Sequence, residues 1–346
     1  MVVAFLLLMV GFFVKAAVVP FHFWLADAYA LAPTVVGVLF AGVVSELGLY
    51  AVARVYWTVF SAPLAGVEGL RGVLLLGAVA TALVGGVMCL LQHHLPRMLA
   101  YATVSHVGLT LAGFALLAPV GVGGAVLYLL ADGLVKGSLF ISVGIVDHHL
   151  HDVDERRLQG RGRHLPWAAA LMVAGALGLA GVPPFGTFLG KALMEEAAVE
   201  AGAPWLVGLF VVVAALTSAA LLRATGRVFL GLGAPSPGRT ADHHRHAHPT
   251  QLAPAVGLLV VAVVVGLVPG LTGAAHHAAE RFTDRPAYAA AVLEGATGTG
   301  PGVTHPPPEL AGPALLAVVS ALLGLGLALA ALRPDRLPGQ LRGGVT

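Results

Sequence analysis

Residues 166–197 read PWAAALMVAGALGLAGVPPFGTFLGKALMEEA, an apolar run that contains two adjacent prolines and one lysine. A helix needs only about 20 residues to cross the roughly 30 Å hydrocarbon core of a bilayer, so this run is too long for one straight span. Proline removes a backbone donor and clashes with the preceding turn, so we expect the helix to break at Pro183 and Pro184. Beyond the break the run reaches Lys191. The stretch therefore predicts a membrane-spanning helix that is interrupted close to a charged side chain.

The two other lysines of the chain have the same setting. Lys15 and Lys136 lie inside long apolar runs, whereas all 16 arginines lie in the connections between runs or at their ends. A charge at the centre of a spanning helix costs roughly 2.5–3.5 kcal/mol on insertion scales, so such a lysine persists mainly where it faces a bundle interior or an aqueous path. Arginine is effectively always charged, whereas a buried lysine can exchange its proton. This distribution indicates a membrane protein that carries protons.

The composition assigns the chain to the same class. Hydrophobic residues make up 58%, charged residues 10%, and the mean hydropathy is +0.89, well outside the range of about 45–50% apolar and 25% charged for soluble domains. The formal net charge of +2 is too small to suggest a nucleic-acid partner. The single cysteine, Cys89, lies in an apolar run, which argues against disulfides and cysteine-bound metals. We expect an all-α, polytopic transmembrane bundle.

Windows of about 20 residues give about nine candidate spans. The first contains Lys15 and lacks a basic leader and a cleavage site, so we interpret it as a retained span and not as a signal peptide. The candidate spans lie near residues 1–19, 34–57, 72–92, 97–118, 122–146, 166–197, 203–229, 252–272 and 310–332.

The connections between these spans differ in character. Residues 147–165 are charged, residues 231–250 are rich in Pro, Gly and His, and residues 273–309 are rich in Gly and Pro with no apolar core. None has the composition of a soluble domain. We expect one membrane domain over 1–230, followed by two further spans with their loops over 231–346.

The arginines predict the orientation of the bundle. Twelve fall in connections on one side of the expected spans, and these are Arg97, Arg156, Arg157, Arg161, Arg163, Arg223, Arg227, Arg239, Arg245, Arg333, Arg336 and Arg342. Only Arg54, Arg71, Arg281 and Arg285 fall on the other side. Because cytoplasmic connections carry an excess of Lys and Arg, the N-terminus is expected outside and the C-terminus in the cytoplasm of a cell-membrane protein.

Several motifs carry a resemblance to a known family. The stretch KAAVVPFHFWLADA (15–28), followed by APT (32–34) and AGVVSELGLY (41–50), is similar to the signature of the antiporter-like proton-channel subunits. RMLAYATVSHVG (97–108), KGSLF (136–140) and LAGVPPFGTFLGK (179–191) follow in the family's order. That family includes membrane subunits of respiratory complex I, of hydrogenase-4 and formate hydrogenlyase, and of multisubunit cation/proton antiporters. The resemblance covers about 190 residues, and residues beyond about 230 match only as generic spans.

The resemblance implies roles for individual residues. Lys15 matches an essential seventh-helix lysine that donates or accepts the transported proton. Glu46 stands where the eighth helix usually has a lysine, and Asp132 precedes Lys136 where the eleventh helix usually has a histidine. Lys191 matches the residue that ends the relay on the twelfth helix and exchanges protons with the external side. Two positions thus depart from the family pattern, although every position still titrates.

The residues themselves support this set. Asp132 and Lys136 are four apart, so on a helix they share one face and can pair. His106 is a candidate relay member, with a packing role as the alternative. The segments around Pro20 and around the Pro183-Pro184 pair resemble each other, and paired proline-interrupted spans are typical of inverted repeats with ion sites at the broken helices.

The start of the chain departs most from the family. Members have six more helices before the one that matches Lys15, including a fifth-helix glutamate that partners this lysine. A mis-assigned start, a degenerate gene and a split protein remain open as explanations. The ordered set of buried charges argues against decay.

Two classes of function stay open. The first is a proton-translocating membrane subunit of a redox-driven complex, and the second is a subunit of a secondary cation/proton antiporter, which would carry protons or sodium. A non-conducting remnant is a third possibility. We expect other membrane subunits as partners and no catalytic residue, cofactor or metal site, because no nucleophile arrangement, phosphate loop or cysteine cluster is present. The histidines of 243–248 are interpreted as a solvated loop, not as a metal site.

Overall fold

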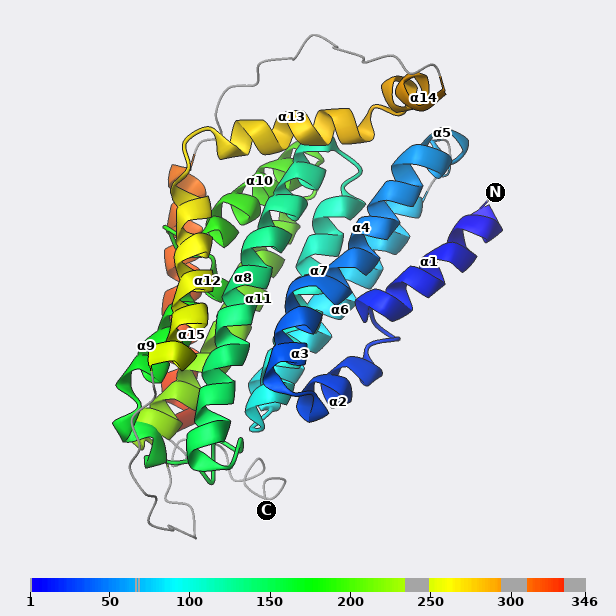
Figure 1. Ribbon diagram of the computed structural model, residues 1–346. Coiled ribbons are helices and arrows are strands. Elements are labelled where there is room, and N and C mark those ends of the chain that lie inside the picture. Colours follow the sequence, from blue (N-terminus) through cyan, green and yellow to red (C-terminus); the bar gives the residue numbers. More distant parts are fainter. Residues whose placement is uncertain (1, 66, 68, 234–248, 294–309, 333–346) are drawn as a thin grey trace.

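The computed structural model describes residues 2–65, 67, 69–233, 249–293 and 310–332, and the described chain folds as a helical bundle (Figure 1). Its first half contains α1 (Val2–Ala16), α2 (Phe23–Leu31), α3 (Thr34–Leu39), η1 (Phe40–Val44), α4 (Ser45–Val55), η2 (Tyr56–Phe60), α5 (Ser61–Leu64), α6 (Leu70–Leu91), α7 (Leu95–Ala115) and α8 (Pro119–Leu150). The second half contains η3 (Arg161–His164), α9 (Pro166–Ala180), α10 (Gly186–Glu200), α11 (Trp205–Thr225), η4 (Gly226–Leu230), α12 (Pro249–Leu267), α13 (Leu271–Thr283), α14 (Arg285–Leu293) and α15 (Ala311–Leu332).

Six of the described helices are long and apolar enough to cross a membrane. The first is a compound helix over Thr34–Leu64, formed by α3, η1, α4, η2 and α5, and the others are α6, α7, α8, α11 with η4, and α15. These six fall on six of the expected spans, and the prediction of an all-α polytopic bundle is confirmed. The other three expected spans lie on helices that are short or broken. Near 1–19 and 166–197 the apolar helices α1 and α9 are short, and near 252–272 the pair α12 and α13 is bent.

One expected span ends earlier than predicted, and the connection after it is partly helical. α12 stops at Leu267, and α13 leaves it at 85° and lies across one end of the bundle, followed by α14 (Figure 1). The prediction of a span to residue 272 was therefore wrong in detail, and so was that of a loop over 273–293, whereas residues 294–309 lie outside the described residues. Gly270, with φ of +77°, makes the turn. Because α13 mixes apolar and charged side chains, it suits the boundary of the apolar layer and not its interior.

Two proline-containing breaks lie where the sequence predicts them. α1 ends at Ala16 and α2 begins at Phe23, with Pro20 between them. α9 ends at Ala180 and α10 begins at Gly186, with Pro183 and Pro184 in the gap. Both Val19-Pro20 and Pro183-Pro184 have cis peptide bonds. The freed backbone groups are partly paired again, since the Thr187 hydroxyl donates to the Gly178 carbonyl across the gap at 2.6 Å.

α8 is the central helix of the bundle. It packs against α7, α10, α12, α13 and α3, while α6 packs against α7 and α15 against α11 (Figure 1). The backbones of α8 and α10 approach closely at Gly190, where an added Cβ would lie 2.3 Å from the Tyr128 backbone nitrogen. The two spans beyond residue 230 thus pack directly on the spans before it.

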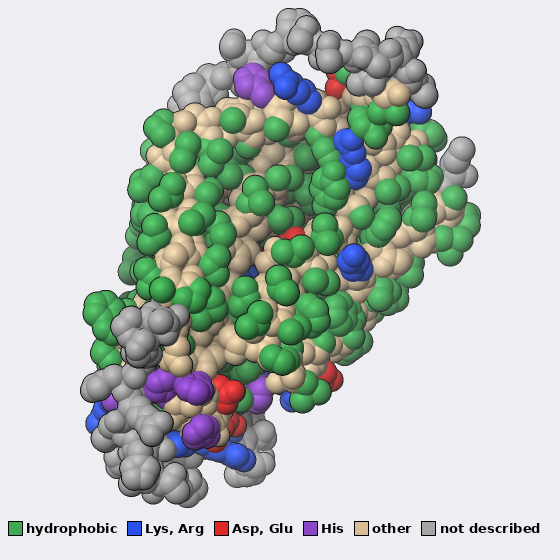
Figure 2. Space-filling view, viewed as in Figure 1, with side chains coloured by type: hydrophobic (Ala, Val, Ile, Leu, Met, Phe, Trp, Pro, Cys, Tyr) green, Lys and Arg blue, Asp and Glu red, His purple; other side chains and the backbone are tan. Residues whose placement is uncertain are grey.

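The described arginines divide between the two ends of the bundle. At the end with α13 and α14, Arg54 lies over the rings of Phe282 and Tyr288, and Arg71 donates to the Ala201 carbonyl. At the other end the α8–α9 connection pairs with the α6–α7 connection, for example through the Leu95 amide and the Val153 carbonyl at 2.9 Å. Figure 2 shows apolar side chains over the middle of this face and charged and histidine side chains mainly toward its ends. The bundle has the surface of a membrane protein.

Candidate functional site

A set of polar side chains is buried between α7, α8 and α11. The Nδ1 atom of His106 lies 2.6 Å from Oδ1 of Asp132, and the other oxygen of this carboxylate pairs with the Lys136 ammonium. The Tyr128 hydroxyl lies 3.0 Å from the same Nδ1, and the Thr217 hydroxyl lies 3.3 Å from Nε2. Lys136 has an exposed fraction of 0% and Asp132 of 1%. One carboxylate therefore joins a histidine to a lysine inside the bundle.

The helices explain why these groups meet. Asp132 and Lys136 lie one turn apart on α8, so the predicted pair is formed within one helix. His106 lies on α7, where 94% of the residues in the apolar segment are buried. Its ring must therefore find hydrogen-bond partners inside the protein. Removing either member of such a buried pair leaves an uncompensated charge. The three groups therefore depend on one another.

The hydrogen-bond geometry can accommodate both the neutral and the protonated imidazole ring of His106. In the neutral ring, Nδ1–H donates to Asp132 and Nε2 accepts from the Thr217 hydroxyl. In the protonated ring both N–H groups donate, and the Thr217 hydroxyl turns to the carbonyl of Val213, 3.0 Å away. Rotation of one hydroxyl thus accommodates the gain or loss of a proton.

Glu46 enters the same region from the compound helix. Its side chain is 5% exposed, and its Oε2 has no hydrogen-bond partner among the described residues. The carboxyl lies within electrostatic range of Lys136 and Asp132. Two glycines allow this approach, because a Cβ on Gly133 of α8 would lie 3.2 Å from the Gly42 Cα. The π-helical turn η1 directly precedes α4, and such turns occur frequently at functional sites.

Lys191 lies on the other side of α8. It is 2% exposed on α10, and its Nζ lies 3.8 Å from Glu195 Oε1 and 3.3 Å from the Ser320 hydroxyl of α15. Its aliphatic stem passes over the helix break, where a Cβ on Gly181 would lie 3.3 Å from the Lys191 Cδ. The break predicted from the prolines therefore provides room for this lysine.

Lys15 does not join these groups. Its side chain is exposed on the last turn of α1, and no described side chain pairs with it. Phe5, Met9 and Ala16 take the buried face of α1, which packs mainly on α4 at the edge of the bundle (Figure 1). Lys15 therefore does not face the interior of the bundle formed by the described helices, because no described helix covers its face. Its role in a proton relay stays a prediction.

A second buried ionic cluster was not expected from the sequence. Glu155 is 0% exposed, and its Oε1 lies 2.6 Å from His93 Nδ1 and 3.0 Å from Arg223 Nε. Arg156 NH2 lies 2.6 Å from His93 Nε2. These groups join the α6–α7 connection, the α8–α9 connection and the end of α11. The sequence shows only that this connection is charged, and nothing in its spacing predicts that it folds back onto the bundle.

The neighbouring residue, His94, lies in the α6–α7 connection outside the spans. Burial, and then the nearby charge of Arg97, lower the pKa of His94 below its usual value. This end of the bundle therefore prefers a neutral His94 ring.

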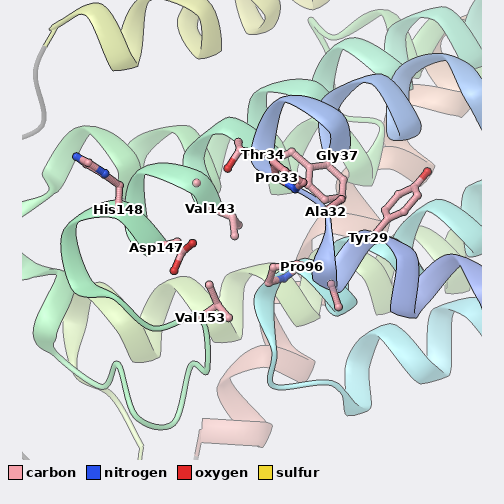
Figure 3. A pocket seen from close by; sticks show the side chains of 13 residues that line it. Tyr29, Ala32, Pro33, Thr34, Gly37, Pro96, Val143, Asp147, His148 and Val153 are labelled. Carbon is pink, nitrogen blue, oxygen red and sulfur yellow. The ribbon is translucent and has the colours of Figure 1, made fainter.

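A pocket of about 410 Å³ opens at this end, between the α2–α3 turn and the end of α8. Asp147 lies on one side and Tyr29 on the opposite side, whereas His148 points away from the other labelled residues (Figure 3). The Tyr29 hydroxyl lies 3.3 Å from that of Ser45, the residue before Glu46. The pocket is large enough for several water molecules.

No group of His, Cys, Asp and Glu suited to a metal ion was found among the residues that the structure describes. The histidines at 243–248 lie outside them, so the interpretation of that string as a solvated loop stays a prediction.

The comparisons with known proteins agree with this architecture. The family model described as NADH:quinone oxidoreductase/Mrp antiporter, TM, matches residues 1–217. The chain belongs to this family. It is 32% identical over 227 residues to F(420)H(2) dehydrogenase subunit N of Methanosarcina mazei, covering 63% of this chain and 45% of that protein. It is 34% identical over 245 residues to NADH-quinone oxidoreductase subunit N of Desulforudis audaxviator, covering 70% and 48%.

A solved structure shares the fold. A chain of the Mrp complex from Dietzia sp. DQ12-45-1b superposes with a TM-score of 0.74 at 29% identity, covering 84% of this chain and 61% of that one. The chain spans about half the length of the curated relatives described above. The family resemblance drawn from the sequence motifs is therefore confirmed.

Proposed function

We propose that this chain is a proton-translocating membrane subunit of a redox-driven complex. Protons would pass between Glu46, Lys136, Asp132, His106 and Lys191. The observation that carries the proposal is the Asp132 carboxylate, which contacts both Lys136 and His106 inside the bundle. Each of these groups can alternate between two protonation states, and neighbours couple because a unit charge in a low-dielectric interior acts strongly on the next.

A cation/proton antiporter subunit is the second candidate. The TM-score of 0.74 with a chain of the Mrp complex favours it. The two relatives with dehydrogenase and oxidoreductase names favour the first candidate, a subunit of a redox-driven complex. Both classes would use the same buried relay, and they differ in what drives it. Sodium in place of protons remains part of the second candidate.

We also propose a companion, a location and an orientation for this chain. Lys15, exposed in an apolar helix, supports a companion segment or chain that covers α1 with a carboxylate. We further propose a cell-membrane location with the N-terminus outside and the C-terminus in the cytoplasm, because the described arginine-rich connections gather at the end away from α13.

One experiment separates the candidates. The complex is purified from native membranes, reconstituted in vesicles, and monitored with a pH-sensitive dye. A redox-driven subunit predicts acidification on adding an electron donor and a quinone. An antiporter predicts proton movement on imposing a sodium or potassium gradient alone. Movement in neither case, with the complex intact, would contradict both and favour a non-conducting remnant.

The same preparation tests for a companion. We expect co-purification of a companion chain whose helices cover the exposed face of α1 beside Lys15. Recovery of this chain alone, still conducting, would contradict that expectation.

A further inference from the structure

Ser320 lies on α15, beyond the 1–217 region that the family model matches. It is 0% exposed, and its hydroxyl donates to the Leu316 carbonyl at 2.8 Å. A hydroxyl has one proton, so its lone pairs remain to accept from another donor. The Lys191 Nζ lies 3.3 Å away on that side. Ser320 is therefore an acceptor for the lysine in this arrangement.

The acidic neighbour of Lys191, Glu195, lies further from the ammonium than Ser320 does. Glu195 Oε1 lies 3.8 Å from Nζ, which is longer than a normal hydrogen bond, and neither Glu195 oxygen has a hydrogen-bond partner among the described residues. The Lys191 ammonium thus lies between a carboxylate that it approaches and a hydroxyl that it contacts. Hydrogen bonds to an ionised donor are stronger than neutral ones, so Ser320 favours the charged lysine in this position.

The packing of α15 sets this contact. Gly324, one turn beyond Ser320, lies against Ser218 of α11, and a Cβ there would lie 2.3 Å from the Ser218 hydroxyl. Ala317 and Ala328, on the same face, are also buried. Only a helix with small residues along this face can come close enough to α11 for Ser320 to reach Lys191.

We infer that α15 contributes to the proton path. Ser320 acts as a positioning residue, because its hydroxyl accepts a hydrogen bond from the Lys191 ammonium at the end of the relay. This inference rests on the proposed function, since it assigns a role in the transfer of protons at Lys191. It adds to the relay a group from a helix that the matched part of the family does not include.

The test uses the intact complex with four substitutions. Ser320→Ala removes the acceptor, and we expect roughly a ten- to hundredfold loss of proton transport, the effect of one hydrogen bond to a charged group. Ser320→Val and Ser320→Thr have the same shape and differ in the hydroxyl, so Thr should recover transport relative to Val. Ser218→Ala removes a buried hydroxyl from the same helix interface without touching a titratable group, and it should transport as the wild type does.

The pH profile of transport provides a readout that a packing defect would not move. We expect Ser320→Ala and Ser320→Val to shift the pH of half-maximal transport, and Ser218→Ala and Ser320→Thr to leave it in place. Wild-type rate and profile in Ser320→Ala, or equal transport by Thr and Val variants that both remain active, would overturn the inference. If added bulk inactivates both Thr and Val, the comparison of Ser320→Ala with Ser218→Ala decides.

A Lys136→Ala variant, measured in parallel, separates this inference from the function beneath it. Full transport in Lys136→Ala would refute the proposed relay. Loss of transport in Lys136→Ala together with wild-type transport in Ser320→Ala would refute the role of α15 and leave the proposed relay standing.

Discussion

Lys136 and Lys15 lie in similar apolar sequence but in different surroundings. Lys136, on the central helix α8, is fully buried and paired with a carboxylate that also holds His106. Lys15, on the edge helix α1, is exposed and has no described partner. A charged side chain in an apolar layer needs a partner or water in both places. The α8 region satisfies that need within the chain, whereas the α1 region requires something outside the described residues.

The largest effect is expected from Asp132→Ala. It leaves Lys136 and His106 buried without their shared acceptor, and breaking a buried pair destabilises a protein by about 3–5 kcal/mol. Chemical unfolding in detergent would show the loss, and proton transport should fall to background. Asp147→Ala is the matched control on the same helix, because Asp147 is exposed, and its effect should stay within about 0.5 kcal/mol. Equal stability of the two variants would show that the α8 network is not held by Asp132.

Gly190→Ala tests the packing that brings Lys191 to α8. An added Cβ would lie 2.3 Å from the Tyr128 backbone, so the helices must separate, at a cost of about 1–3 kcal/mol. Gly208→Ala on α11 meets no atom within 4 Å and should be neutral or stabilise by up to about 1 kcal/mol. Thermal unfolding of both variants in detergent measures the difference. An unchanged Gly190→Ala would contradict the close approach of α8 and α10.

Thiol labelling compares the two lysine positions directly. The only cysteine, Cys89, is buried, so a Cys89→Ser chain gives a clean background. We expect Lys15→Cys to react with N-ethylmaleimide when this chain is purified alone and to be protected in the complex, and Lys136→Cys to stay protected in both. Mass spectrometry measures the labelled fraction. Protection of Lys15→Cys in the isolated chain would contradict the exposed α1 face.

The smallest effect concerns His94 at the arginine-rich end. The pKa of His94 is lowered in the folded chain, so the unfolded chain binds the proton more readily and stability is lost as the pH falls below about 6.5. His94→Gln should reduce the loss of unfolding free energy between pH 7 and pH 5, by less than about 1 kcal/mol. A larger loss in the variant than in the wild type would show that the sign is wrong.

Much of the bundle could be predicted because its signals are local. Apolar runs of about 20 residues, the prolines at 20 and 183–184, and the four-residue spacing of Asp132 and Lys136 each act within one segment. The orientation of Lys15 could not be predicted, because an apolar run of this kind does not show which face a neighbouring helix covers. Ser320 and Glu155 were missed for a related reason: a serine in an apolar span and a glutamate in a charged connection gain partners only through tertiary packing.

The central claim is that Lys136 exchanges a proton and does not only supply a fixed charge. Proton transport by the reconstituted complex with Lys136→Arg tests it most directly, with Lys136→Ala beside it. Arginine keeps the positive charge near Asp132 but cannot release its proton, so both variants should lose transport by more than about tenfold. Wild-type transport by Lys136→Arg would show that Lys136 is a structural charge and would contradict the relay.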